Sequence, residues 1–401
     1  MESARIVATL TRYTGDFALA EDLAQEALAE ALAGWPAHGV PASPGAWLVA
    51  VGKRRAIDGW RRAARQDERY AALARELDEA VDASAPPWDP DAIDDDVLRL
   101  VFIACHPVLA REASIALTLR TVGGLTTKEI ARAFLVPTAT VQQRIVRAKR
   151  TLAAAAVPFE VPSREEYPRR LSAVLSVLYL IFNEGYAAAA GDAWMRADLA
   201  REALRLARVL AALVPREPEA HGLVALMELL AARFPARLDA NGDPVLLADQ
   251  DRTRWDRVLI DRGRRALARA DALGRGRGPY GLQAAIAECH DTAASVADTD
   301  WGRIVLLYEA LGRIAPSPVV ELNRAVAVSM AEGPATALRI VDGLMAEGRL
   351  AGYGLLPSVR GELLVRLGRA AEAREEFARA TELTGNVRER AVLEGKLREL
   401  G

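Results

Sequence analysis

The chain has 401 residues, of which 51% are hydrophobic, so it is long enough for two or three folded domains with apolar cores. Its formal net charge is −2, which excludes a uniformly basic nucleic-acid-binding protein and confines any such contact to local patches. Only 5% of the residues are aromatic, and a composition dominated by Ala, Leu, Arg and Glu indicates an all-α fold.

The cysteine and hydropathy patterns favour the cytoplasm. Cys105 and Cys289 are far apart and offer no disulfide framework, which suits a reducing compartment. The N-terminal stretch lacks the charged, apolar and small-residue order of a signal peptide. The apolar run 171–182 is too short to span a bilayer. We therefore expect a cytoplasmic protein with no membrane partner.

Residues 1–70 predict an acidic helix beside a basic one. The first, over 19–32, turns Leu23 inward and its acids outward, and no Lys or Arg lies between Arg12 and Lys53. A Pro- and Gly-containing loop over 35–44 follows, and a second helix begins near Pro44. Its later part, 53–69, has seven basic residues against three acidic ones. The acidic face would meet a basic protein surface and the basic face nucleic acid, unless both are simply solvated.

The next segment, 71–95, is acidic and contains Pro86, Pro87 and Pro90. Such a composition seldom packs, so we expect an extended linker. Residues 96–156 form another helical block, with a helix over 111–120 that ends at a Gly pair.

The end of this block predicts a helix-turn-helix. Thr126 and Glu129 have capping-box spacing, and Pro137 separates two short helices. The second helix has an apolar face of Val141, Ile145, Ala148 and Leu152 and a polar face of Gln142, Gln143, Arg144, Arg147, Lys149 and Arg150. Gln can pair with adenine, and Arg and Lys can meet phosphates, so this helix is a candidate major-groove reader. The alternative is an amphipathic hairpin with a solvated face.

Residues 157–401 continue as an Ala/Leu/Arg-rich helical pattern. Its end contains a repeat with an offset of 36, in which Ala337 corresponds to Ala373 and Val341 to Phe377. Each copy reads as two helices joined by a short turn, which is the pattern of tetratricopeptide-like repeats. Further copies needed for a stable stack should lie within 160–320, although no clean period is visible there.

Motifs for catalysis are missing from the sequence. It has no Gly-rich phosphate loop, no GxSxG and no HExxH, so we expect no enzyme activity and no cofactor. Two adjacent Cys-His pairs, at 105–106 and 289–290, have poor geometry for one zinc ion and predict buried thiols instead. In the segment 278–301 the candidate side chains for a ligand pocket are Gln283, Glu288, His290, Asp298 and Asp300, and the alternative is core helices with polar edges.

Three motifs in order resemble bacterial sigma factors of the extracytoplasmic-function type, which keep the second and fourth conserved sigma regions. ALAEDLAQEALAEAL, from Ala18, is similar to the family's helix that docks on the clamp of the largest subunit of core RNA polymerase. SPGAWLVAVGKRRAIDGWRRAARQDER, from Ser43, resembles the segment that melts the promoter and reads its −10 element. LTLRTVGGLTTKEIARAFLVPTATVQQRIVRAKRTL, from Leu117, resembles the helix-turn-helix that reads the −35 element.

The resemblance implies three sets of contact residues. Polymerase would be bound by Asp16, Glu21, Asp22 and Gln25. The −10 element would be bound by Lys53, Arg54, Arg55, Asp58, Arg61 and Arg62, with the loop 35–43 as the wall of a pocket for a flipped base. The −35 element would be bound by Thr138, Thr140, Gln142, Gln143, Arg144, Arg147 and Lys149. The family commonly has Ser at the position of Pro137, so the N-cap shifts to Thr138 or is weak.

The implied architecture is two small helical sigma domains, 1–70 and 96–156, joined by the linker 71–95. A large helical extension, 157–401, has tetratricopeptide-like repeats that are clearest at 319–384. The extension, of which SPVVELNRAVAV from Ser317 is typical, resembles that of a sigma-factor subgroup in which it modulates activity. The implied function is an alternative sigma factor that initiates transcription, with a regulatory protein or ligand as a further partner of the extension. The alternatives are a stand-alone helix-turn-helix regulator with a sensing domain, and a scaffold or enzyme within 160–320.

Overall fold

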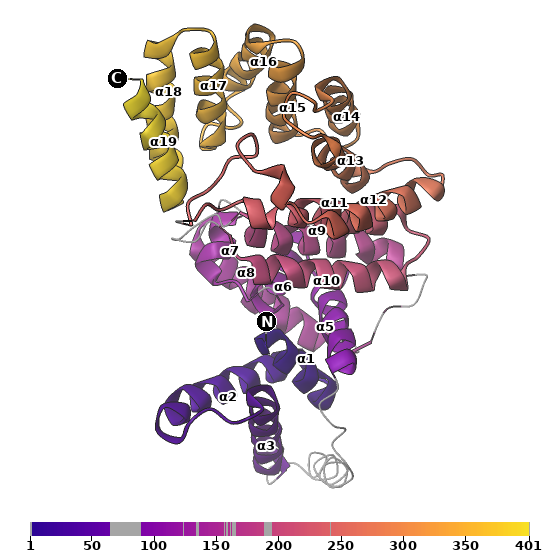
Figure 1. Cartoon of the computed structure of the whole chain (residues 1–401). Coiled ribbons are helices and arrows are strands. Elements are labelled where there is room, and N and C mark those ends of the chain that lie inside the picture. The colour runs from indigo at the N-terminus through magenta and orange to yellow at the C-terminus, as the bar shows by residue number, and fades with distance from the viewer. Residues whose placement is uncertain are drawn as a thin grey trace. The chain divides into compact units, whose positions relative to one another are not determined.

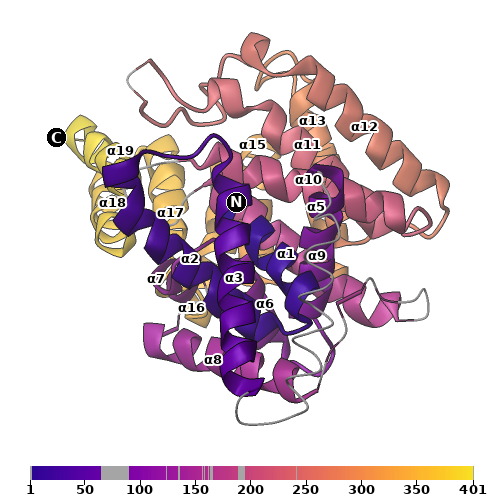
Figure 2. The same ribbon diagram turned by 90° about the horizontal axis from the view of Figure 1, so that it is seen from below.

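The structure is a computed structural model that describes residues 2–64, 90–122, 124–133, 136–155, 157, 159–160, 162, 166–187, 195–240 and 242–400. These residues are almost entirely helical, as the composition predicts, and their one β-type pairing is an isolated bridge between Leu238 and Pro244. The chain divides into two compact units, 1–180 and 181–401 (Figures 1 and 2). Across the described ranges, no helix has the length and hydropathy needed to cross a membrane.

The first unit contains seven helices of the described chain and most of an eighth, which crosses into the second unit. They are α1 (Glu2–Thr14), α2 (Phe17–His38), α3 (Pro44–Ala64), α5 (Pro90–Ala104), α6 (Arg111–Thr121), α7 (Thr127–Ala133), α8 (Thr138–Ala154) and α9 (Tyr167–Tyr186). α1 packs against α2, α3 and α5, and its Ile6 and Leu10 are fully buried. Asp96 of α5 is also fully buried, and its carboxylate lies 3.3 Å from Arg12 of α1 and 2.6 Å from Arg99.

Two boundaries in this unit differ from the predicted ones. α2 continues through Pro36 to His38, so the connection to α3 is 39–43 and does not begin at Trp35. Pro36 lies in the last turn, where its missing N–H costs one bond to Leu32, and Leu32 is exposed to water. Gly39 ends the helix with φ 82° and donates its N–H to Trp35. α5 begins at Pro90, within the predicted linker, because proline suits a first helical turn. The rest of that linker, 65–89, lies outside the described residues.

The second unit is a run of further helices that follow one another along the chain. They are α10 (Ala197–Leu213), α11 (Pro218–Ala232), α12 (Arg257–Ala272), α13 (Pro279–Thr292), α14 (Trp301–Ile314), α15 (Pro318–Ala331), α16 (Pro334–Glu347), α17 (Leu355–Arg366), α18 (Ala370–Leu383) and α19 (Val387–Glu399), with short 3-10 turns at Phe234–Ala236 and Arg252–Arg254. α11 is buried on almost every side and packs against α10, α12 and α13.

The predicted repeat corresponds to two helix pairs. α16 and α18 begin and end 36 residues apart, and the equivalent positions Ala337 and Ala373 are both fully buried. From α14 to α19 each helix packs against the next, as the upper part of Figure 1 shows. α13 and α14 form the preceding pair, but their connection 293–300 is much longer than the turns 332–333 and 367–369. This longer loop breaks the 36-residue spacing, which explains why the sequence shows no third copy.

Candidate nucleic-acid interface

The helix-turn-helix forms as its capping signals predict. The N–H of Thr126 donates to Glu129 Oε2 at 2.7 Å, and the N–H of Glu129 donates to Thr126 Oγ1 at 3.2 Å. This reciprocal pair begins α7. Thr138 is the first helical residue of α8, and Pro137 precedes it without a side-chain cap, so the start of α8 is weakly capped.

The two faces of α8 are separated as expected. Val141, Ile145, Ala148 and Leu152 are buried, and α8 packs against α6 and α7 through this side. On the opposite face Gln142, Gln143 and Arg147 are exposed, while Thr138, Thr140, Arg144 and Lys149 are half-buried. The exposed amides lie near the N-terminal end of α8 and the exposed basic residues nearer its C-terminal end. This arrangement can present hydrogen-bonding groups to base edges and cations to phosphates.

The acidic residues of α2 differ in their surroundings. Asp16 is the N-cap of the helix, and its carboxylate accepts the N–H groups of Ala18 at 2.8 Å and Leu19 at 3.1 Å. Asp22 and Gln25 are exposed. Glu21 is only 5% exposed, so the expectation that all the acids of this helix point outward is wrong. A buried carboxylate requires a partner, and the structure supplies one from a distant helix.

That partner is Lys149 of α8, whose ammonium forms an ion pair with Glu21. α2 and α8 pack against each other around this pair. The contact therefore joins one residue from the expected polymerase-binding set to one from the expected −35 set. No sequence signal indicated this, because the two residues lie far apart along the chain.

The basic residues of α3 are partly paired with the acids of α2. Arg55 lies 2.8 Å from both Glu26 and Glu30, and Arg54 lies 3.2 Å from Glu30. The hydrogen bond to Glu30 is the main reason that the pKa of Arg55 is raised. The acidic and basic helices therefore interact with each other, which the reading of two separate faces did not include.

Other residues of the expected −10 set remain near the surface. Asp58, Arg61 and Arg62 are exposed, and the guanidinium of Arg62 donates to the backbone oxygen of Asp58 at 3.2 Å. Lys53 is half-buried, with its ammonium 5.1 Å from the centre of the Tyr13 ring. Burial and the nearby Arg12 lower the pKa of Lys53.

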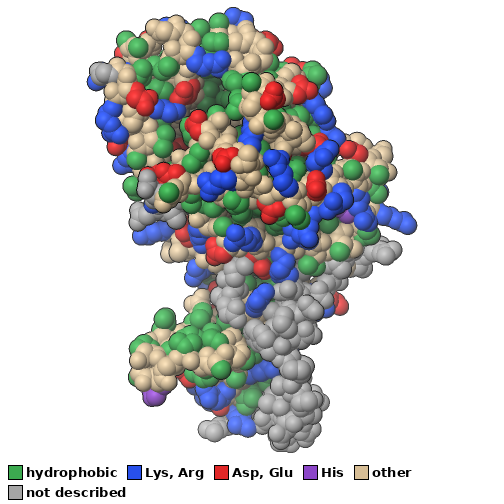
Figure 3. All heavy atoms as spheres, in the orientation of Figure 1, with side chains coloured by type: hydrophobic (Ala, Val, Ile, Leu, Met, Phe, Trp, Pro, Cys, Tyr) green, Lys and Arg blue, Asp and Glu red, His purple; other side chains and the backbone are tan. Residues whose placement is uncertain are grey.

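An exposed apolar patch on α2 was missed by the sequence reading. Leu32 is 78% exposed, and Val40, just after the helix, is 64% exposed. Hydrophobic side chains gather on the surface over α2 in Figure 3. A single exposed leucine is common on protein surfaces. Leu32, however, lies on the same helix face as Asp22, Gln25 and Ala29, which are also exposed. The spacing i, i+3, i+7, i+10 would have identified it, because these positions share one helix face.

The cysteines have the environment of structural thiols. Both are buried and free, and burial raises the pKa of Cys105 to about 12. Within the described ranges, no group of His, Cys, Asp and Glu side chains could hold a metal ion. Of the residues expected around a ligand pocket, His290 lines a cavity that also involves Trp301 and Tyr308. Gln283 donates to the backbone oxygen of Pro279, and Glu288 pairs with Arg264. The Asp298 carboxylate accepts from the Ser295 hydroxyl, and Asp300 is the N-cap of α14.

Comparison with known proteins agrees with this arrangement of helices. Residues 2–66 match the family model of sigma-70 region 2, and residues 99–152 match that of sigma-70 region 4. The chain belongs to the sigma-70 family. Residues 170–271 match a family of unknown function (DUF6596), so this sigma factor has a C-terminal extension of the kind expected for an extracytoplasmic-function-like member.

A relative in Rhizobium meliloti (strain 1021), named only as an uncharacterized protein, is 48% identical over 394 residues. The alignment covers 98% of this chain and 92% of that protein, so it includes the extension. Sigma-70 regions 2 and 4 assign this chain a role in promoter recognition, with core RNA polymerase and promoter DNA as its partners. Sigma-factor families are non-enzymatic transcription factors.

Proposed function

We propose that the chain is an alternative sigma factor in which α2 binds core polymerase, α3 and the loop 39–43 read the −10 element, and α8 reads the −35 element. The corresponding domains are 1–70 and 96–156, joined by 71–95, and the extension 157–401 modulates their activity. The observation that carries this proposal is that the first unit has two separate exposed surfaces, one on α2 and one on α8.

The polymerase-binding surface would be the exposed stripe of α2. Asp22, Gln25, Ala29 and Leu32 share one exposed face, and the Gln25 amide donates to Glu21 at 3.1 Å, beside the ion pair with α8. A stripe with this spacing fits against another helix, as in a coiled coil. Its acidic start would attract a basic surface, and its apolar end would be buried on docking. Glu21 contributes to this surface only after its pair with Lys149 separates.

The promoter-bound form must differ from the packed first unit. The centres of elements named −10 and −35 are about 25 base pairs apart, which is roughly 85 Å along B-DNA at about 3.4 Å per base pair. A compact unit of 180 residues is only about 40 Å across. α3 and α8 therefore cannot read both elements while α2 and α8 remain packed. The packed form is the state of the chain before promoter binding, and its opening is a point at which the extension can act.

Promoter-specific run-off transcription with core enzyme and the full chain tests the proposal. We expect a transcript that core enzyme alone does not give, and its loss with Asp22→Arg, because reversing this exposed charge repels a basic docking surface. Arg254→Glu is the matched control, since Arg254 is an exposed charge on the second unit. DNA binding by the chain without any core-dependent transcript would instead support a stand-alone regulator.

A further inference from the structure

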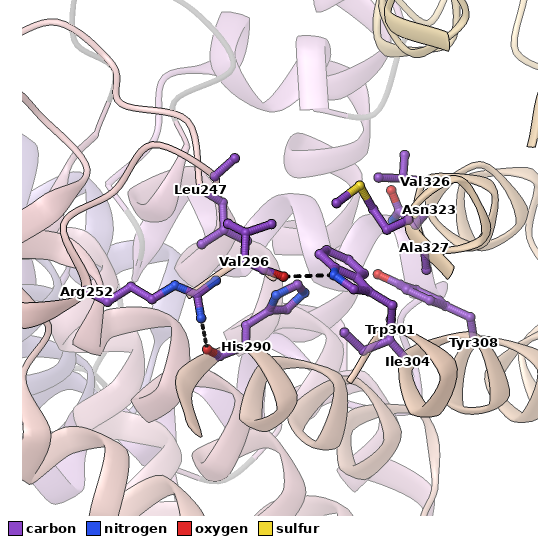
Figure 4. A pocket seen from close by; sticks show the side chains of 12 residues that line it. Leu247, Arg252, His290, Val296, Trp301, Ile304, Tyr308, Asn323, Val326 and Ala327 are labelled. Carbon is purple, nitrogen blue, oxygen red and sulfur yellow. Dashed lines mark hydrogen bonds between the residues drawn. The ribbon is translucent and has the colours of Figure 1, made fainter. Parts of the chain in front are cut away.

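A cavity of about 340 Å³ lies wholly within the second unit, at the junction between the repeat helices and the segment before them. Its walls come from the loop near Leu247, from the α13–α14 hairpin and from α15 (Figure 4). The long connection 293–300 contributes Val296. This volume is in the range of small-molecule sites and corresponds to roughly ten non-hydrogen atoms at about 30 Å³ each.

The lining is mainly apolar and aromatic. Leu247, Val296 and Ile304 lie around the rings of Trp301 and Tyr308. The indole of Trp301 is fixed by a hydrogen bond from its Nε1 to the backbone oxygen of Val296 at 3.0 Å and by an edge contact with the His290 ring. In Figure 4 the Tyr308 hydroxyl points toward Trp301. These rigid rings can hold a flat apolar molecule with little loss of side-chain entropy.

Two polar side chains of the cavity, His290 and Asn323, are uncharged and available for hydrogen bonds with a ligand. Burial, with Arg233 and Arg252 nearby, lowers the pKa of His290 to about 3, so its imidazole is neutral at physiological pH and retains one N–H donor. Its ring nitrogens and the Asn323 amide form no hydrogen bonds with other described residues. A ligand that displaces water from these two donor-bearing groups must supply an acceptor, because a donor left unpaired on binding costs free energy.

The charges around the cavity decide which ligands fit. No acidic side chain lines it, and Arg233 and Arg252 nearby disfavour a cation. Arg252 is the cationic group in the lining, and its guanidinium is already bound to the backbone oxygens of His290 and Ala293 at 2.7 and 2.9 Å. A carboxylate would have to compete with these bonds and with the bond to Thr299 for the guanidinium, so its desolvation would be only partly offset.

We infer that this cavity is a binding site for a small uncharged aromatic molecule that carries a hydrogen-bond acceptor. The inference goes beyond the role in promoter recognition and does not depend on it, because the cavity lies entirely outside the sigma regions. The ligand would contact three elements at once, so its binding would stiffen the junction between α13, α14 and α15.

The test uses three probes that share one ring: methyl benzoate, benzoate and benzylamine. Binding to the full chain is measured by saturation-transfer NMR and calorimetry, without polymerase or DNA. We expect saturable binding of methyl benzoate with a Kd of about 1 mM or tighter, since ten atoms at about 0.4 kcal/mol each give roughly 4 kcal/mol. Benzoate and benzylamine should bind at least about 10-fold more weakly.

Three variants test whether methyl benzoate binds in this cavity. Val326→Trp places a large ring in the cavity from a position that is 38% exposed, and it should weaken methyl benzoate at least about 10-fold. Val258→Trp, at an exposed position on α12 outside the cavity, should leave the affinity unchanged. Asn323→Ala should weaken it about 2- to 10-fold. Thermal unfolding confirms that each variant is folded.

Absence of saturable binding, equal binding by benzylamine, or undiminished binding to folded Val326→Trp would each overturn the inference. Loss of core-dependent transcription would leave it intact.

Discussion

Burial and two nearby arginines together disfavour protonation of the His290 side chain. Arg233 and Arg252 act on the ring from elements packed against α13, Asp291 follows it in the chain and pairs with Arg233, and Trp301 contacts its edge. Because burial lowers the pKa of the imidazole to about 3, we predict that its Cε1–H resonance does not titrate between pH 5 and 8. Two-dimensional NMR, with assignment by His290→Gln, measures this. In the urea-unfolded chain the same resonance should titrate near about 6.5.

Individual site residues differed in how well the sequence could predict them. The exposed face of α8 follows from helical periodicity alone, so Gln142, Gln143 and Arg147 could be placed correctly. The burial of Glu21 could not be predicted, because it depends on a contact with Lys149 on another helix. Periodicity gives the face of a helix, but it does not identify the neighbour that covers that face.

Among the helices, α17 and α18 show how the repeat adapts to a large side chain. Phe377 of α18 is fully buried, and a Cβ added to Gly361 of α17 would lie 2.8 Å from its ring. The equivalent positions in the preceding pair hold Ala325 and Val341. We predict that Gly361→Ala destabilises the chain by about 1–3 kcal/mol through overpacking. Chemical denaturation followed by circular dichroism measures the change.

Two further variants separate overpacking from a general effect of alanine. Gly343 is an exposed position of α16, and a Cβ added there has nothing within 4 Å, so Gly343→Ala should stabilise the helix by about 0.5–1 kcal/mol. Gly361→Ala should destabilise the chain less in a Phe377→Val background, because the double variant has the Ala and Val found at the equivalent positions of the first repeat. Additive losses in the double variant would contradict the packing explanation.

The boundaries of the elements were less predictable than their existence. The helical repeat, α6 and the helix-turn-helix follow from spacing and caps, whereas α2 and α5 extend beyond their predicted ends at proline residues. Proline is tolerated in the first turn of a helix, and at Pro36 the cost of one lost bond is offset by the packing of the rest of α2. A turn signal in the sequence therefore marks a position where a helix can end, and tertiary contacts decide whether it does.

For the whole molecule, the size of the first unit predicts a change of shape on promoter binding. Spin labels on Ala50→Cys in α3 and Ala153→Cys in α8, both exposed, report the separation of these helices. In the free chain the distance should stay below about 40 Å, the width of a compact unit. With core enzyme and promoter it should lengthen by tens of ångströms. An unchanged distance in a complex that initiates transcription would contradict the opening.

The Glu21–Lys149 pair should bias this equilibrium. Lys149→Glu sets two carboxylates against each other at a buried contact, so the longer distance should become populated without polymerase. Arg150→Glu changes the charge of the exposed neighbouring residue and should leave the distribution unchanged.

The ion pairs between α2 and α3 also affect how ionic strength changes promoter affinity. An arginine that is already paired with a glutamate neutralises less phosphate charge. Arg54 and Arg55 therefore release fewer condensed cations from the DNA than unpaired arginines would. Replacing Glu30 with Gln would free Arg54 for a phosphate. The slope of log K against log[KCl] for the polymerase–promoter complex should then steepen by about 0.9. Glu112→Gln, at an exposed position in the first turn of α6, should leave the slope unchanged. The acids of α2 would thus make promoter binding less sensitive to changes in cellular salt.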